Sequence, residues 1–341
     1  MKINGREIQS DLIRVIAMLF VICVHVHTNL GERHWFLDGL RVAMILTCNG
    51  MFFMLSGKYN LRFQAEKEQN SYGSFYQKKL TSIVIPFVIY TLVVYICNMQ
   101  WENWSLSVAI QDYFRVFFDR NITTHLWFMY QLIGILLSAP FLAVMLHNLS
   151  DKSLILLLSI GFGWNFVSIT LLPDILGYTF NFSGWILSEM LLYFVLGYAL
   201  DRIIKKKEHV MALCGLGILG VIITIVQGHF FEDKFTGLYD LSLVYIFVNI
   251  GLYLFLERIC LIKSENFARV LSFIAKHSFG VYILHFYVIQ WLGNNLHFPW
   301  VKLEIASYLL SVLTVFVLSF AASFFLDTVI INPLQKLFRE K

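Results

Sequence analysis

Long apolar runs separated by short polar segments dominate the chain. A membrane-spanning helix needs about 20 mostly apolar residues, and about ten runs reach this length. Polar residues interrupt the fifth and the ninth run. No internal repeat and no long hydrophilic stretch breaks the series, so the pattern predicts an all-α polytopic membrane protein with one integral membrane domain over residues 1–341. The predicted spans are 11–30, 39–57, 82–100, 125–147, 152–171, 184–201, 210–228, 240–257, 271–292 and 303–331.

The positive charges predict how these spans are oriented. Short cytoplasmic loops of membrane proteins carry an excess of Lys and Arg. Most of the 26 Lys and Arg residues fall in alternate segments between the spans, beginning with the segment before the first one. This bias predicts that the N-terminus and the C-terminus both lie on the cytoplasmic side.

Composition agrees with a chain that lies mostly in lipid. Hydrophobic residues make up 58% and charged residues 14%, against roughly a quarter charged in a soluble domain. The net charge of +4 does not indicate nucleic acid, because the basic residues are dispersed among apolar spans. The five cysteines lie in apolar runs without a C-x-x-C pair, so we expect neither a disulfide framework nor a thiolate metal site. The run 12–26 lacks a small-residue cleavage pattern, which favours a first transmembrane helix over a signal peptide.

The first span contains two ionisable residues, Arg14 and His25, which are costly in a lipid-spanning helix. Eleven residues at 100° each make three turns plus about 20°, so both side chains share one face, about 16 Å apart along the axis. Asp11, three residues before Arg14, is on the same face and is expected to pair with it. His27 points to another side of the helix, so we expect no metal site with His25.

Two interpretations of Arg14 and His25 remain open from geometry alone. An arginine near a helix end can extend to the lipid headgroups, and a histidine in a bundle can serve as a hydrogen-bonding partner only. In the functional interpretation, Arg14 binds the phosphates of an anionic donor and His25 acts as a general base. The extended pantetheine arm of coenzyme A has about the reach needed to span such a gap of about 16 Å.

Four stretches, in order along nearly the whole chain, resemble the membrane-integral acyltransferase 3 family of bacterial enzymes that acylate cell-envelope carbohydrates. Two departures from the family pattern are Val15, where many members have Gly, and Lys58, which directly follows Ser56-Gly57 where an aromatic residue is usual. The four stretches are "DLIR" (Asp11–Arg14) with His25 at the spacing R-x10-H, "FFMLSGKYNL" (Phe52–Leu61), "HLWFMY" (His125–Tyr130) and "HSFGVYILHFYVI" (His277–Ile289).

The resemblance implies an O-acyltransferase of the bacterial cytoplasmic membrane. Its donor would be an acyl-CoA co-substrate, most often acetyl-CoA, on the cytoplasmic side, with no bound cofactor. Its acceptor would be a hydroxyl of an envelope glycan or glycolipid. His25 would be the catalytic residue, as base or as acyl carrier, and Arg14 would position the donor. Whether the chain acts alone, as a homo-oligomer or with a separate extracytoplasmic acyltransferase stays open.

Four basic residues flank the longest loop predicted on the cytoplasmic side: Lys58, Arg62, Lys78 and Lys79. They are candidates for binding the phosphates of the donor. The alternative is that they only orient the protein and contact anionic lipid.

Three further residues are candidates for the acceptor site or for support of His25. His125 and Trp127 open the fourth span at its predicted outer end, where an indole can stack on a sugar. An interfacial Trp beside a solvated His is the alternative. His285 belongs to the last family stretch, and we interpret it as a supporting or packing residue.

Glu189 is an acid in the outer third of the sixth span, which is costly unless it is paired. It could orient His25 or bind the acceptor, or it could pair with a structural partner such as Arg41.

A transporter or flippase of a lipid-linked sugar or acyl donor is the main rival function. Intramembrane Arg, His and Glu can line a transport path as well as an active site. The absence of a visible repeat and of paired Gly- or Pro-broken spans in the sequence argues against it.

Overall fold

The computed structural model describes residues 2–3, 6–26, 35–64, 71–98, 105–119, 122–178, 187, 190–231, 242–296 and 305–339. Within these ranges the only strands are β1 (Lys2–Ile3) and β2 (Arg6–Glu7), which pair antiparallel, and the other regular elements are helices. Eight helical stretches within these ranges are long and apolar enough to cross a membrane, counting consecutive helices together. The chain is therefore an all-α, multi-pass membrane protein, as the sequence predicts.

Each predicted span overlaps one or more helices of the structure. The sixth overlaps α9 (Met190–Ile203), and the eighth overlaps α11 (Leu243–Leu254) with its continuation η5 (Phe255–Ile259); as described, both are shorter than the eight stretches that are long enough to cross a membrane. The remaining helices are α1 (Ile8–His25), α2 (Trp35–Ile45), α3 (Cys48–Asn60), α4 (Tyr72–Lys79), η2 (Leu80–Val84), α5 (Ile85–Asn98), α6 (Leu106–Phe118), η3 (Thr124–Leu126), α7 (Trp127–Asn148), α8 (Asp151–Asn165), η4 (Phe166–Ile175), α10 (Lys207–Phe230), α12 (Glu265–Leu296), α13 (Ile305–Leu326), η6 (Asp327–Ile331) and α14 (Asn332–Arg339).

Two features differ from the sequence prediction. The predicted span 39–57 is not one continuous helix, because α2 ends before α3 begins, and the Thr47 hydroxyl at this break donates to the carbonyl of Met44 (2.6 Å). Helix α6 was not predicted. It has 13 residues and carries Asp112 and Arg115, so a search for apolar runs of about 20 residues passes over it.

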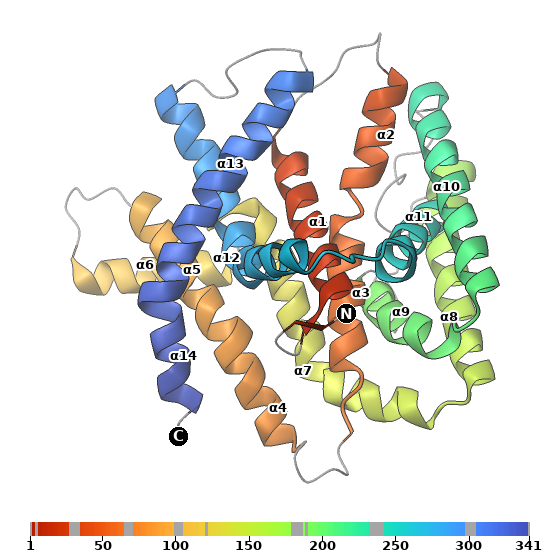
Figure 1. Ribbon diagram of the computed structural model, residues 1–341, viewed down its shortest axis with the longest axis horizontal. Helices are drawn as coiled ribbons and strands as arrows, with labels where there is room; N and C mark the ends of the chain where they lie inside the picture. The colour runs from red at the N-terminus through yellow and green to blue at the C-terminus, as the bar shows by residue number, and fades with distance from the viewer. Residues whose placement is uncertain are drawn as a thin grey trace.

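The helices surround a central α1 (Figure 1). This helix packs against α12, α3, α2 and α13. Helices α8, α9, α10 and α11 lie on one side of it, and α5, α6, α13 and α14 lie on the other. The start of α2, the end of α10 and the start of α13 share one edge of the bundle, whereas α4 and α14 reach the opposite edge. The shared edge of these three ends agrees with the sequence prediction, which places the start of the second span, the end of the seventh and the start of the tenth on one side of the membrane.

Helices α3 and α9 touch through their backbones. A Cβ atom on Gly57 would lie 1.6 Å from the carbonyl oxygen of Phe194, and one on Gly197 would lie 1.8 Å from that of Met54. Only glycine fits at either position, as is common where transmembrane helices approach closely. This contact fixes the position of Ser56 and its neighbours along the axis of α3 relative to α9.

Lys58 forms a buried ion cluster that joins three parts of the chain. Its ammonium lies 2.8 Å from Glu7 Oε2 and 2.7 Å from Glu257 Oε1, and the residue is only 5% exposed. The cluster ties the start of α1 to α3 and to η5. A buried charge is tolerated only when paired, and Lys58 is shared by both carboxylates, although Glu257 also pairs with Arg258 (3.2 Å) and Glu7 accepts a hydrogen bond from Tyr59 (3.1 Å).

Replacing Lys58 with methionine is expected to lower the free energy of unfolding by about 2 kcal/mol. The substitution keeps an unbranched side chain of nearly the same length but removes the cation at Glu257 Oε1, which leaves this buried carboxylate with Arg258 as its remaining cationic partner. The loss is smaller than for a fully buried pair because Glu7 is about one-third exposed and can be hydrated. Thermal unfolding in detergent micelles measures it. Lys152→Met, at an exposed lysine on α8, is the control, and equal stability of the two variants would contradict the prediction.

The pH dependence of this cluster follows from Glu7. Burial raises the pKa of its carboxyl, but the hydrogen bond and charge of Lys58 outweigh burial, so the pKa lies below its ordinary value of 4.5. Glu7 therefore contributes stability that is complete above about pH 4.5 and is lost as the pH falls through the lower folded-state pKa. We expect the melting temperature of the wild type to drop more than that of Glu7→Gln between about pH 6 and about pH 3. An equal drop in both proteins would show that Glu7 has no such role.

Candidate active site

Arg14 and Asp11 form an ion pair on α1. Arg14 Nη1 lies 2.9 Å from Asp11 Oδ1, as the spacing of three residues predicts. The Asp11 side chain is 1% exposed and that of Arg14 is 29% exposed. The carboxylate is thus buried in the bundle, while the guanidinium extends toward open space.

That space is a cavity of about 320 Å³ between α1, α3, the end of α4, η2, α7 and α12. Its volume lies within the range of ligand pockets, roughly 300–1,000 Å³. Arg14 and Lys79 supply cationic groups to its lining, and Ser56, Tyr59 and Asn60 supply neutral polar groups. Two cations beside neutral polar groups suit an anionic ligand that also carries amide or hydroxyl groups.

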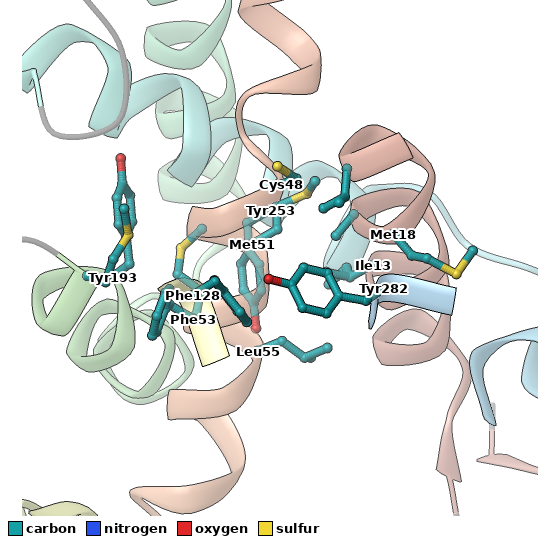
Figure 2. Packing of buried hydrophobic residues seen from close by; sticks show 14 of the residues in the cluster. Ile13, Met18, Cys48, Met51, Phe53, Leu55, Phe128, Tyr193, Tyr253 and Tyr282 are labelled. Carbon is teal, nitrogen blue, oxygen red and sulfur yellow. The ribbon is translucent and has the colours of Figure 1, made fainter. Parts of the chain in front are cut away.

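Aromatic rings line another part of the same cavity. Phe52, Phe128 and Tyr282 pack with ring centroids 5.8 Å apart for Phe52–Phe128 and 5.5 Å apart for Phe128–Tyr282. Figure 2 shows Tyr282 reaching from α12 toward the packed core that includes Phe128 and Met51. The Tyr282 hydroxyl donates a hydrogen bond to the carbonyl of His125 (2.6 Å). We call these three rings the aromatic wall. It connects the cavity to the elements that carry the histidines.

Three histidines from distant parts of the chain meet beside this wall. The ring centroids lie 5.0 Å apart for His25 and His285, 4.8 Å for His125 and His285, and 5.7 Å for His25 and His125. The ring of Phe286 covers the group at 5.5 Å from His25 and 5.1 Å from His125. His125 and His285 are buried, and His25 is half-buried. We call these three residues the histidine cluster.

The histidine cluster is ordered by hydrogen bonds around His25. His25 Nδ1 lies 2.8 Å from the carbonyl oxygen of Val21 and 3.2 Å from His285 Nε2. His285 Nδ1 in turn lies 2.5 Å from the carbonyl oxygen of Tyr282. Neither ring nitrogen of His125 has a hydrogen-bond partner among the described residues, and within the same residues no group of three or more His, Cys, Asp or Glu is arranged to hold a metal ion.

The basic residues predicted to bind the donor lie in different environments. Lys79 lines the cavity, and Lys78 is exposed and does not belong to its lining. Arg62 pairs with Asp201 (2.7 Å), and Lys58 belongs to the buried ion cluster described above. Among these four residues, therefore, Lys79 is the one that lines the cavity, whereas Lys58 and Arg62 have carboxylate partners elsewhere.

The residues predicted near the acceptor also lie in different environments. His125 belongs to the histidine cluster, whereas Trp127 is 38% exposed, with its ring 6.3 Å from that of Phe128. Arg41 pairs with Asp38 (2.6 Å). Glu189 lies outside the described residues.

Sequence reasoning missed Tyr282 and Phe286 as neighbours of the histidine cluster. Both are in α12, on either side of Ile283 to His285. A signal was present, because Tyr282 precedes His285 by three residues and so shares its helix face.

A family model described as "Acyltransferase domain" matches residues 7–328. This range contains α1 through α13 and so includes the cavity and the histidine cluster. No curated protein and no solved structure matches the chain.

Proposed function

The chain belongs to the acyltransferase 3 family, and from this premise we propose that it transfers an acyl group, most often acetyl, from a cytoplasmic acyl-CoA to a hydroxyl of a cell-envelope glycan or glycolipid. The setting proposed for this reaction is the bacterial cytoplasmic membrane. Its partners are the acyl-CoA, the acceptor and the lipid bilayer, and no nucleic acid is involved.

The observation that carries the proposal is that one helix bears both Arg14 and His25. Arg14 lines the cavity at one level of α1, and His25 joins the histidine cluster about 16 Å further along the axis. A donor with phosphates at one end and a thioester at the other fits this separation. The phosphates would contact Arg14 and Lys79, which are the cations of the cavity lining.

The cavity lining also suits the arm that joins the phosphates to the thioester. Ser56 and Asn60 offer hydrogen-bonding groups, and Phe52 and Phe128 offer apolar surface. A pantetheine arm alternates amide groups with short methylene segments, so it needs both kinds of contact. The aromatic wall excludes water near the thioester, which strengthens electrostatic interactions there.

The reaction breaks the thioester C–S bond and forms an ester C–O bond. As a base, His25 takes the proton of the acceptor hydroxyl while the oxygen attacks the thioester carbonyl, and the proton then passes to the sulfur of CoA. As an acyl carrier, the unprotonated nitrogen of His25 attacks the carbonyl first and CoA leaves as the thiolate. The acceptor hydroxyl then takes the acyl group from the imidazole, which is regenerated, and the hydroxyl proton passes to the thiolate. Both routes need an unprotonated ring nitrogen on His25, and His125 and His285 would support its ring.

The test is whether the full-length protein in lipid nanodiscs binds acetyl-CoA and releases free CoA thiol. Titration calorimetry measures binding, and a thiol-reactive dye measures release in the presence of a pool of envelope glycans. We expect binding without the glycans and thiol release over many turnovers only with them. A protein that neither binds nor turns over acetyl-CoA or longer acyl-CoAs would contradict the proposal.

A further inference from the structure

The hydrogen bonds of His285 determine which of its nitrogens carries the proton. His285 Nδ1 lies 2.5 Å from the carbonyl oxygen of Tyr282, and a carbonyl can only accept. Nδ1 must therefore be the N–H donor. In a neutral imidazole the other nitrogen then carries a lone pair, so His285 presents Nε2 as an acceptor toward His25.

Burial keeps His285 in this neutral form. The side chain is 0% exposed and is packed against the rings of His25, His125 and Tyr282. A charged imidazolium there would lose its hydration without gaining a carboxylate among the partners that surround it. A neutral His285 therefore cannot donate to His25 from Nε2.

His25 consequently faces two acceptors with the same nitrogen. The carbonyl oxygen of Val21 and the Nε2 of His285 both lie within 3.2 Å of His25 Nδ1. A lone pair at Nδ1 would be repelled by both, whereas an N–H at Nδ1 is attracted by both. The Nδ1–H tautomer is therefore favoured, and it carries its lone pair on Nε2.

We propose that His285 is a positioning residue that holds His25 as the Nδ1–H tautomer, so that Nε2 is the nitrogen that accepts a proton or an acyl group. This inference rests on the proposed function for its catalytic meaning. The role is the same whether His25 acts as base or as carrier, because both routes use the lone pair of one ring nitrogen. The backbone of Val21 contributes the second acceptor and cannot be removed by substituting its side chain.

The tautomer can be observed directly by solid-state NMR of the full-length protein in nanodiscs with ¹⁵N-labelled histidine. The difference between the spectra of wild type and His25→Gln identifies the His25 signals. We expect a protonated Nδ1 and an unprotonated Nε2 on His25. A protonated Nε2 with an unprotonated Nδ1 would overturn the inference.

Two variants of His285 separate its positioning role from simple packing. His285→Phe keeps an aromatic ring but removes one of the two acceptors and leaves the carbonyl of Val21 (2.8 Å). We therefore expect a detectable Nε2–H population beside the Nδ1–H form of His25, and a kcat about twofold lower with an unchanged KM for acetyl-CoA. His285→Gln carries an amide oxygen near the position of Nε2, and we expect it to restore a single Nδ1–H tautomer and most of the activity. If both variants keep the wild-type tautomer and kcat, His285 has no positioning role.

The NMR measurement also separates this inference from the proposed function. A wild-type protein with the Nδ1–H tautomer but no acyl-CoA turnover would support the geometry of His25 and overturn the acyltransferase proposal alone. An active protein whose His25 is an Nε2–H tautomer would support the acyltransferase proposal and overturn the inference about His25. Should His285→Phe fail to fold, the wild type and His285→Gln still decide the matter, because the tautomer of His25 is read in both.

Discussion

Replacing His25 with alanine is expected to lower turnover of acetyl-CoA about 10³-fold, which is within the range for loss of a general base. The acyl donor should still bind with nearly wild-type affinity, because His25 is not among the residues that line the cavity. Its neighbours His125 and His285 are buried and already packed against other rings, so neither is positioned to replace it without rearrangement. Thiol release under saturating acetyl-CoA, together with calorimetric binding, separates the two effects.

The matched control for this prediction is His209→Ala, at an exposed histidine on α10. We expect its turnover and donor binding to equal those of the wild type. A His25→Ala protein that keeps more than about a tenth of the wild-type rate would exclude His25 from the chemistry. A variant that loses donor binding as strongly as turnover would instead indicate that His25 is needed to form the cavity.

The same variant helps to distinguish the two chemical routes. If His25 carries the acyl group, wild-type protein incubated with radiolabelled acetyl-CoA in the absence of acceptor should retain label, and His25→Ala should not. If His25 is a base, neither protein should retain label. The covalent intermediate thus gives a positive signal for one route only.

Much of the fold could be predicted because its determinants are local. The apolar runs locate the helices, since a span requires about 20 consecutive apolar residues whatever its neighbours are. The relation of Asp11, Arg14 and His25 also follows from one helix, whose 100° rotation per residue sets the shared face. Short or broken elements, such as α6 and the junction between α2 and α3, do not follow from run length.

The histidine cluster could not be assembled from the sequence alone. His25, His125 and His285 lie on three elements that are far apart in the chain, and no local pattern reports which faces of these elements meet. The family stretches identified the three residues separately, without their mutual contacts. Their meeting depends on the packing of α1 against α12 and on the hydrogen bond from Tyr282 to the carbonyl of His125.

Nor could the sequence distinguish the lysines around the loop predicted on the cytoplasmic side. Lys58 and Lys79 are both basic residues near the ends of this loop. Lys58 meets Glu7 and Glu257, which are distant in sequence, whereas Lys79 lines the cavity. A side chain's partners across the bundle decide its role, and charge alone does not reveal them.

Among the cations of the cavity, Arg14 is the one whose removal is expected to weaken donor binding most. We expect Arg14→Ala to lower kcat/KM for acetyl-CoA about 100-fold, mainly through KM, because a guanidinium can make two charge-assisted hydrogen bonds, each contributing about 1.5–3 kcal/mol. Removing it also leaves the carboxylate of Asp11 near the cavity without this cation, which adds repulsion toward phosphates. Arg14→Lys should have a kcat/KM between those of the wild type and Arg14→Ala, since lysine keeps the charge but not the planar guanidinium.

The chain offers a matched control in Arg115, which pairs with Asp112 at the same spacing of three residues but lies on α6, 70% exposed and outside the cavity lining. Arg115→Ala should leave kcat/KM unchanged, so any loss specific to Arg14→Ala comes from its place in the cavity rather than from breaking an ion pair on a helix. Adding Asp11→Asn to Arg14→Ala should recover part of the lost affinity by removing the repulsion. If Arg14→Ala binds acetyl-CoA as tightly as the wild type, the guanidinium is a lipid-headgroup contact, and the donor phosphates must be held by Lys79 and by groups outside this cavity.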